Sequence, residues 1–162
     1  MNKIKYVLFV CMGNTARSPA AEYLAKGLKQ HKYKEGLKDV VFDSAGFFNA
    51  FSYMQPESRN YMESKGISAS DFVPKVLSQQ LIKNQDLILT MEKSHSKDII
   101  RNFSNILNLD KKVFTLKEFA GEKGDLDIID PYYTSTGVYK KILKIIDENV
   151  EKSIKRIIEI NK

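Results

Sequence analysis

The feature that most constrains the fold is an alternation of short apolar runs with longer amphipathic stretches along the 162 residues. The first run, residues 4–10, is rich in β-branched and aromatic side chains and is typical of a central strand in a parallel sheet. Gly13 and Asn14 then end the strand. Ser18 followed by Pro19 predicts a helix with a serine N-cap and proline at its first position. The chain therefore opens with a strand, a short loop and a helix.

The rest of the chain repeats this pattern. We expect strands over residues 40–42, 86–91 and 112–114, helices over 56–65, 94–103 and 138–160 with a short one from 78, and loops over 47–53 and 121–124. Strands that alternate with helices predict a three-layer α/β/α fold, with a four-stranded, parallel, doubly wound sheet and right-handed crossovers. No internal repeat or linker interrupts the pattern, so we expect a single domain over residues 1–162.

The cysteine content limits the chemistry. The chain has one cysteine, Cys11, which cannot by itself form an internal disulfide, a zinc cluster or a dithiol redox pair. The apolar run around it, residues 6–12, is far too short to span a membrane, and Val10 is too large for a signal-peptide cleavage site. We therefore expect a cytoplasmic protein with a reduced thiol, no metal, no organic cofactor and no membrane partner.

The charge distribution does not favour a nucleic-acid partner. The chain carries 26 basic and 20 acidic side chains, which gives a net charge of +6. In residues 138–160 the basic side chains are interleaved with acidic ones, as on a solvated helix face. No aromatic residues alternate with a basic run, which single-stranded nucleic acids would favour. We expect no nucleic acid to bind.

The loop after the first strand has the pattern of an anion site. In parallel α/β folds, ligands bind beyond the carboxyl ends of the strands. A short glycine-containing loop that runs into a helix directs several backbone N–H groups at one centre, where the helix dipole adds positive potential. Arg17, six residues after Cys11, adds a planar fork that can hold two phosphate oxygens. These groups would stabilise a thiolate at Cys11, and Ser18 could donate a hydrogen bond to the sulfur.

A thiolate in a phosphate-binding loop suggests phosphoryl transfer through a cysteinyl-phosphate. Such a reaction needs an acid to protonate the leaving oxygen. The best candidate is Asp130, which follows an apolar pair and precedes the last helix, so that it can lie at the same edge of the sheet. Pro131 would stiffen this segment, and Tyr132 and Tyr133 would form the walls of a slot for a planar substrate.

The motifs VLFVCMGNTARSPAAE and DPYY together closely resemble the low-molecular-weight protein tyrosine phosphatases, and DSAG and DLILTMEKS lie between them in the family's order. The resemblance implies that Cys11 is the nucleophile, Arg17 a ligand of the phosphate and the transition state, and Asp130 the general acid and then the base. It further implies that Asn14 and Ser18 brace the phosphate-binding loop and that Ser44 braces Asn14. The residues assigned to the loop are Met12, Gly13, Asn14, Thr15, Ala16, Arg17 and Ser18.

The chain departs from many members of this family at its substrate pocket. After DSAG the chain does not have the threonine, or the tryptophan or tyrosine, at the place where many relatives have them. The segment 47–55 offers Phe47, Phe48, Phe51 and Tyr53 as apolar substitutes, and Phe48 or Phe51 is the expected wall of the pocket. The histidine that some relatives use to brace the loop is replaced around Asp71 and Phe72, which predicts a different network behind Asn14.

Thr15 leaves the substrate open between two classes. Tyrosine phosphatases of this family often have a bulkier aliphatic residue here, whereas threonine resembles the protein-arginine phosphatase branch. That branch tends to lack the double tyrosine after Asp130 and Pro131. We expect a protein-tyrosine phosphatase that acts on phosphorylated proteins as a monomer or weak dimer. The alternatives are a protein-arginine phosphatase of the same fold and a non-catalytic phosphate-binding module.

Overall fold

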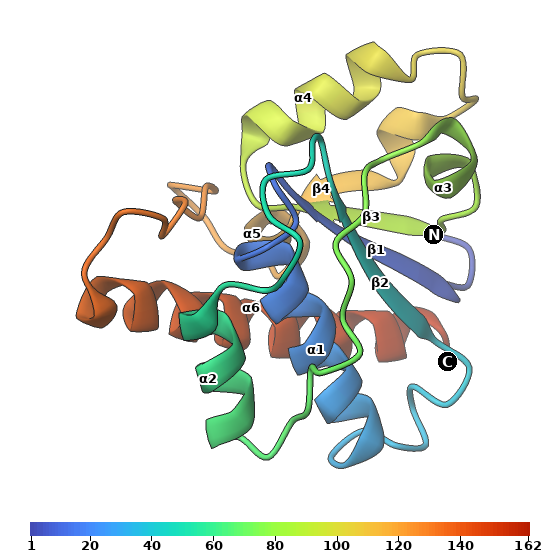
Figure 1. Cartoon of the computed structure of the whole chain (residues 1–162). Helices are drawn as coiled ribbons and strands as arrows, with labels where there is room; N and C mark the ends of the chain where they lie inside the picture. The colour runs from blue at the N-terminus through green and yellow to red at the C-terminus, as the bar shows by residue number, and fades with distance from the viewer.

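Four parallel strands form the central sheet of the computed structural model, which describes residues 1–162 (Figure 1). The strands are β1 (Tyr6–Cys11), β2 (Val41–Gly46), β3 (Leu87–Thr90) and β4 (Val113–Thr115). Their order in the sheet is β2-β1-β3-β4, so the chain winds outward from β1 in both directions. The predicted α/β fold with a four-stranded, parallel, doubly wound sheet is therefore confirmed.

Helices cover both faces of this sheet (Figure 1). One face is covered by α1 (Arg17–Gln30), α2 (Pro56–Ser64), α5 (Leu116–Phe119) and α6 (Thr136–Ile160). The other face is covered by α3 (Gln79–Lys83), α4 (Lys93–Asn102) and the short 3-10 helix Leu109–Lys111. Each layer closes its own apolar core against the sheet, and the larger core lies under α1 and α6.

The two-residue period of β1 decides which core each side chain enters. Val7, Phe9 and Cys11 point into the larger core, under α1. Leu8 and Val10 point into the smaller core, under α4. Cys11 is the last residue of the strand, so its sulfur lies at the carboxyl edge of the sheet and on the α1 side.

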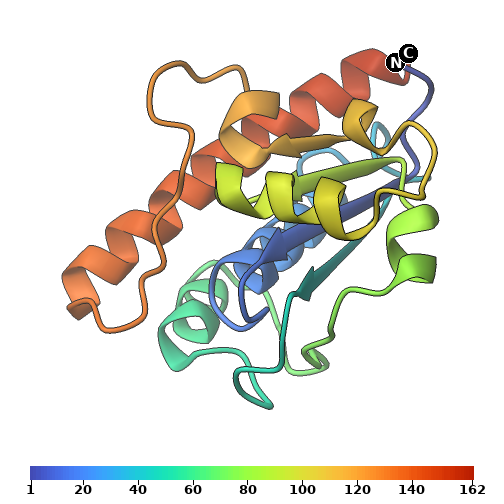
Figure 2. The same ribbon diagram turned by 90° about the horizontal axis from the view of Figure 1, so that it is seen from above.

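The carboxyl edge of the sheet is also reached by the segment between α5 and α6. Figure 2 shows that the beginning of α6 extends past the ends of the strands, with the segment that contains Asp130 leading into it. The far end of α6 returns to the N-terminus, where Asn161 Oδ1 accepts a hydrogen bond from Ile4 N at 2.7 Å (Figure 2). No helix of the structure combines the length and the apolar composition needed to cross a membrane.

Two predicted boundaries were wrong. The second strand continues to Gly46 instead of ending at residue 42, because its last residues pair with β1 up to Cys11. The first helix begins at Arg17 with Ala16 at its N-cap, so Ser18 does not cap it. The hydroxyl of Ser18 is used elsewhere, as described below. The helix α5 was not predicted, because four residues are too few for a visible apolar period.

Candidate active site

The loop between β1 and α1 turns its carbonyl groups outward. Three of them accept hydrogen bonds from the chain that follows β2: Met12 O from Phe47 N at 2.7 Å, Thr15 O from Gln55 N at 2.8 Å, and Ala16 O from Ser58 Oγ at 3.1 Å. The amides of residues 13–16 donate to no other group of the protein. A loop held in this way presents its N–H groups together, which is the arrangement that binds anions at the beginning of a helix.

Gly46 lies directly against the backbone of the loop between β1 and α1. A Cβ atom at this position would lie 2.7 Å from Asn14 N and 2.8 Å from Met12 O, so only glycine allows the loop backbone to lie this close. The sequence interpretation assigned no role to Gly46, although it is the last residue of the DSAG motif. The signal that could have identified it is a glycine directly at the carboxyl end of a strand beside β1.

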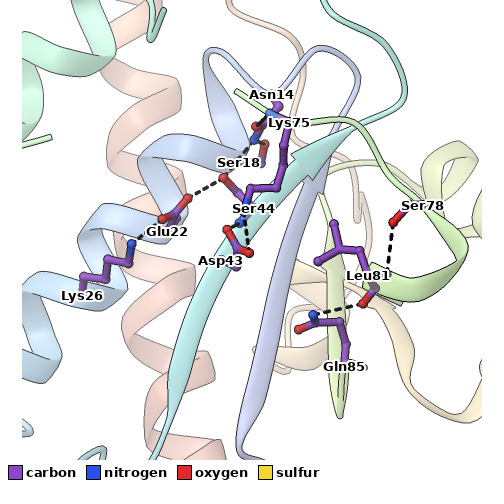
Figure 3. Close-up of polar contacts among 10 residues, drawn as sticks. All are labelled: Asn14, Ser18, Glu22, Lys26, Asp43, Ser44, Lys75, Ser78, Leu81 and Gln85. Carbon is purple, nitrogen blue, oxygen red and sulfur yellow. Dashed lines mark hydrogen bonds and ion pairs between the residues drawn. The ribbon is translucent and has the colours of Figure 1, made fainter. Parts of the chain in front are cut away.

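The structure brings Cys11, Ser18, Asn14 and Ser44 into one buried cluster. Cys11 Sγ lies 2.9 Å from Ser18 Oγ. Asn14 Nδ2 donates to Ser18 Oγ and to Ser44 Oγ, both at 2.9 Å, and Asn14 Oδ1 accepts from Lys75 N at 2.9 Å (Figure 3). Asn14 has a φ of 54°, in the left-handed region, so these bonds hold a backbone conformation that few side chains adopt.

Arg17 is held at one end of its guanidinium group. Its Nη1 donates to Glu92 Oε2 at 2.5 Å and to Ile128 O at 2.6 Å, and the side chain is only 2% exposed. Its Nε and Nη2 donate to no protein acceptor, and Nη2 lies 3.8 Å from Asp130 Oδ2. The free end of the fork is therefore available to a ligand in the cavity that Arg17 lines.

Glu92 was missed by the sequence interpretation, although it lies in the quoted motif DLILTMEKS. It follows the end of β3 closely, at the same edge of the sheet as Cys11, and this position is the signal that could have identified it. Behind it lies the buried His95, whose Nε2 is 3.4 Å from Glu92 Oε2. Burial lowers the pKa of His95, the charge of Arg17 lowers it further, and Glu92 opposes both effects.

A cavity of about 310 Å³ opens beside the loop. Cys11, Arg17 and Asp130 all contribute to its wall, so the three residues predicted to be catalytic surround one space. Asp130 is about half exposed, and its Oδ1 accepts a hydrogen bond from Tyr132 N at 3.0 Å, which fixes the turn after the carboxylate. No three His, Cys, Asp or Glu side chains gather where they could share a metal ion.

Three of the four expected pocket aromatics lie at this cavity. Phe48, Phe51 and Tyr132 line it, and the ring centroids of Phe51 and Tyr132 are 5.6 Å apart. Tyr133 does not line it: its side chain is 93% exposed and its φ is 70°, because the chain turns outward there. The expectation that both tyrosines form the slot is therefore wrong for Tyr133.

The segment where a bracing histidine is replaced does not reach the loop. Asp71 Oδ1 accepts a hydrogen bond from Tyr23 OH at 2.9 Å, and Phe72 packs edge-on against the ring of Tyr23. The network behind Asn14 is instead closed by the backbone of Lys75 and by Glu22, which accepts a hydrogen bond from Ser44. The brace is thus built differently, from residues that the sequence interpretation did not single out.

Comparison with known proteins places these features in a family. The sequence model of the low molecular weight phosphotyrosine protein phosphatases matches residues 6–161. A protein-arginine-phosphatase of Bacillus subtilis (strain 168) is 32% identical over 152 residues, which cover 93% of this chain and 95% of the relative. The low molecular weight protein-tyrosine-phosphatase PtpB of Staphylococcus aureus is 35% identical over 136 residues, covering 82% and 85%.

A solved structure agrees with the sequence comparison. The low molecular weight protein tyrosine phosphatase from T. tengcongensis superposes with a TM-score of 0.80 at 35% identity, over 94% of this chain and 99% of that one. The match thus includes the sheet, both helical layers and the loop after β1. The chain belongs to the low molecular weight phosphotyrosine protein phosphatase family.

Proposed function

We propose that this protein hydrolyses phosphotyrosine in phosphorylated proteins through a cysteinyl-phosphate intermediate. The observation that carries the proposal is the shared cavity of Cys11, Arg17 and Asp130, next to a loop whose amides have no other acceptor. A phosphate group fits such a set of donors, and the thiol lies where it can attack the phosphorus. Family membership supports the same reaction.

In this mechanism Cys11 attacks the phosphorus as a thiolate, while Arg17 and the loop amides hold the non-bridging oxygens. The bond between phosphorus and the ester oxygen breaks, and Asp130 gives its proton to the leaving oxygen. Asp130 then accepts a proton from the water that attacks the phosphocysteine. The bond between sulfur and phosphorus breaks, which releases inorganic phosphate and restores the thiolate.

The aromatic walls favour a ring-bearing substrate. Phe48, Phe51 and Tyr132 would pack against a phenyl ring whose phosphate reaches the loop. A phosphorylated protein in the cytoplasm is the partner that we infer, because a lone nucleophilic thiol remains reduced in that compartment.

A second candidate substrate is phosphoarginine. Thr15 lines the cavity, and the Bacillus subtilis relative is a protein-arginine-phosphatase. A small side chain with a hydroxyl at this position suits a guanidinium group better than a bulky aliphatic one does. The reaction, the nucleophile and the acid would be the same for this substrate.

The experiment that tests the proposal compares phosphotyrosyl and phosphoarginyl peptides of one sequence as substrates for the wild type, Cys11→Ser and Thr15→Ile. We expect the wild type to favour phosphotyrosine, Cys11→Ser to be inactive on both, and Thr15→Ile to retain phosphotyrosine turnover. A wild-type preference for phosphoarginine that Thr15→Ile abolishes would establish the second candidate instead. Turnover that survives in Cys11→Ser would contradict the mechanism for both substrates.

A further inference from the structure

Gln55 is a buried residue at the catalytic cavity, and the proposed mechanism does not use its side chain. Only 8% of the residue is exposed, and it lines the cavity that Cys11 and Asp130 share. Its Nε2 group is buried without a hydrogen-bond partner. Buried amides in folded proteins are nearly always hydrogen-bonded, so an unpaired amide in the wall of a cavity indicates that a ligand contacts it.

We propose that Gln55 is a specificity-determining residue: its side-chain carbonyl accepts a hydrogen bond from the guanidinium group of a phosphoarginyl substrate, beside the hydroxyl of Thr15. The inference rests on the proposed function and deepens its second candidate substrate, because it names a contact that a phosphoarginyl side chain can make and a phosphotyrosyl ring cannot. It depends on where the backbone holds Gln55, on which end of its amide is open, and on how donors and acceptors are distributed around the cavity.

The backbone holds Gln55 directly beside the phosphate-binding loop. Its N–H donates to Thr15 O at 2.8 Å, and its carbonyl oxygen accepts from Arg59 N at 3.0 Å. Gln55 is the N-cap residue of α2 and precedes Pro56, whose ring restricts the backbone of both residues. The side chain therefore starts from a point that is fixed by the loop on one side and by α2 on the other.

The oxygen end of the Gln55 amide is the end that can meet a ligand. Nε2 is enclosed by the protein, whereas Oε1 is not enclosed in this way and accepts no hydrogen bond from a protein group. An amide oxygen can only accept hydrogen bonds. The ligand group that completes it is therefore a donor, which excludes the oxygens of a phosphate dianion.

Donors and acceptors occupy different parts of the cavity. At the loop, the amides of residues 13–16 and the free end of Arg17 donate, and they suit phosphate oxygens. On the wall, Gln55 Oε1 and the hydroxyl of Thr15 can accept. A substrate that matches both parts carries a phosphate bonded directly to a group with N–H donors. Phosphoarginine has this form, because its phosphorus is bonded to one guanidinium nitrogen and the others carry N–H groups.

The aromatic part of the wall admits either substrate. Phe48, Phe51 and Tyr132 can pack against a phenyl ring, and a planar guanidinium group also stacks on aromatic faces. Thr15 and Gln55 are therefore the residues that distinguish the two substrates. A substrate that removes Gln55 Oε1 from water without donating to it binds less tightly, because the cost of desolvating the amide is not recovered.

The reaction on phosphoarginine has the same steps as on phosphotyrosine. Cys11 attacks the phosphorus, the bond between phosphorus and the guanidinium nitrogen breaks, and this nitrogen leaves with the bonding electron pair and takes the proton of Asp130. Gln55 takes no part in these bond changes. It binds an N–H on a nitrogen that is not bonded to phosphorus, which keeps the leaving nitrogen aligned opposite the sulfur.

The test measures kcat/KM for phosphoarginyl and phosphotyrosyl peptides of one sequence, and the readout is the ratio of the two values. Gln55→Met removes the acceptor with little change in side-chain size, whereas Gln55→Glu keeps an acceptor. The matched control is Gln85→Met, because Gln85 is also 8% exposed. Its Nε2 donates to Leu81 O at 3.1 Å, and it precedes β3, at the opposite edge of the sheet from the cavity. The melting temperature of each variant shows that it is folded.

We expect Gln55→Met to lower the ratio of phosphoarginine to phosphotyrosine turnover by about tenfold, because a hydrogen bond to a charged group is lost. Gln55→Glu should keep the ratio at or above the wild-type value, since a carboxylate also accepts from a guanidinium group. Gln85→Met should leave the ratio unchanged even if it lowers the melting temperature. A general loss of folded protein affects both substrates alike and cancels in the ratio.

A wild type that turns over no phosphoarginyl peptide would overturn the inference, even if it hydrolyses phosphotyrosine as proposed. An unchanged ratio in folded Gln55→Met would also overturn it, as would a ratio in Gln55→Glu as low as that in Gln55→Met. If the wild type hydrolyses phosphoarginine with the expected dependence on Gln55 but no phosphotyrosyl peptide, the role of Gln55 stands and the first proposed substrate fails.

Discussion

Glu92 Oε2 lies 2.5 Å from Nη1 of Arg17, and this pair determines which end of the guanidinium group faces the cavity. Both side chains come from the carboxyl edge of the sheet, Arg17 from the beginning of α1 and Glu92 from the residue before α4. The ion pair is largely withdrawn from solvent at Arg17, so it orients the arginine more firmly than an exposed pair would.

Replacing Glu92 should therefore weaken catalysis. We expect Glu92→Ala to lower kcat/KM for a phosphotyrosyl peptide by about 10- to 100-fold, because Arg17 loses the partner that fixes its orientation. The control is Glu159→Ala, which removes an exposed carboxylate paired with Lys162 at 3.0 Å and should leave kcat/KM unchanged. Equal kinetic effects of the two substitutions would argue against an orienting role for Glu92.

Replacing Gly46 with alanine tests whether this residue supports the loop, and the same substitution at Gly137 is the control. Gly46→Ala should lower stability by about 1–3 kcal/mol and reduce kcat/KM, because its Cβ would press on the backbone of Asn14 and Met12. Gly137→Ala, in the first turn of α6 with no atom within 4 Å of the added Cβ, should raise stability by about 0.5 kcal/mol without affecting turnover. Urea denaturation and steady-state kinetics measure both effects; full activity in Gly46→Ala would show that the loop does not need this support.

The buried His95 makes stability depend on pH. Burial and the charge of Arg17 lower the pKa of His95 below its usual 6.5, so below pH 6.5 the unfolded chain binds a proton that the folded protein resists. The free energy of unfolding should consequently fall as the pH drops below about 6.5. In His95→Gln this contribution is absent, so the difference in stability between wild type and variant should shrink between pH 7.5 and pH 5.

His31 provides the control for this measurement, because it is exposed at the end of α1 and is the only other histidine. His31→Gln should leave the pH dependence of the wild type unchanged. Groups such as Glu22, whose raised pKa acts in the opposite direction, are common to all three proteins and cancel in the comparison. A stability difference between wild type and His95→Gln that is constant over this pH range would contradict a neutral buried His95.

The sequence was most informative where the signal is local. Cys11, Arg17 and the loop between them span seven residues, and the strand before and the helix after them have clear patterns, so their meeting point could be predicted. The parallel sheet could be predicted from the alternation of strand and helix patterns alone. The end of β2 could not be placed in this way, because Ser44 looks like a turn residue until its hydrogen bonds to Glu22 and Asn14 are known.

The residues whose roles could not be predicted owe those roles to contacts between distant parts of the chain. Glu92 is 75 residues from Arg17, and nothing in the local pattern identifies it as the partner of that arginine. Ser18 shows the same limit in reverse: next to Pro19 it has the pattern of a helix cap, but the fold places its hydroxyl against Cys11 Sγ. Tyr133 follows a tyrosine that lines the cavity, yet a left-handed backbone turns it into solvent.

The most direct test of the central claim is the mass of the protein after a rapid acid quench during turnover of a phosphotyrosyl peptide. The account predicts a transient species that carries one added phosphoryl group, which peptide mapping locates on Cys11. In Asp130→Asn the species should both form and decay more slowly, because Asp130 is the acid of the first step and the base of the second. Turnover without any phosphorylated Cys11, or with the phosphoryl group on another residue, would contradict it.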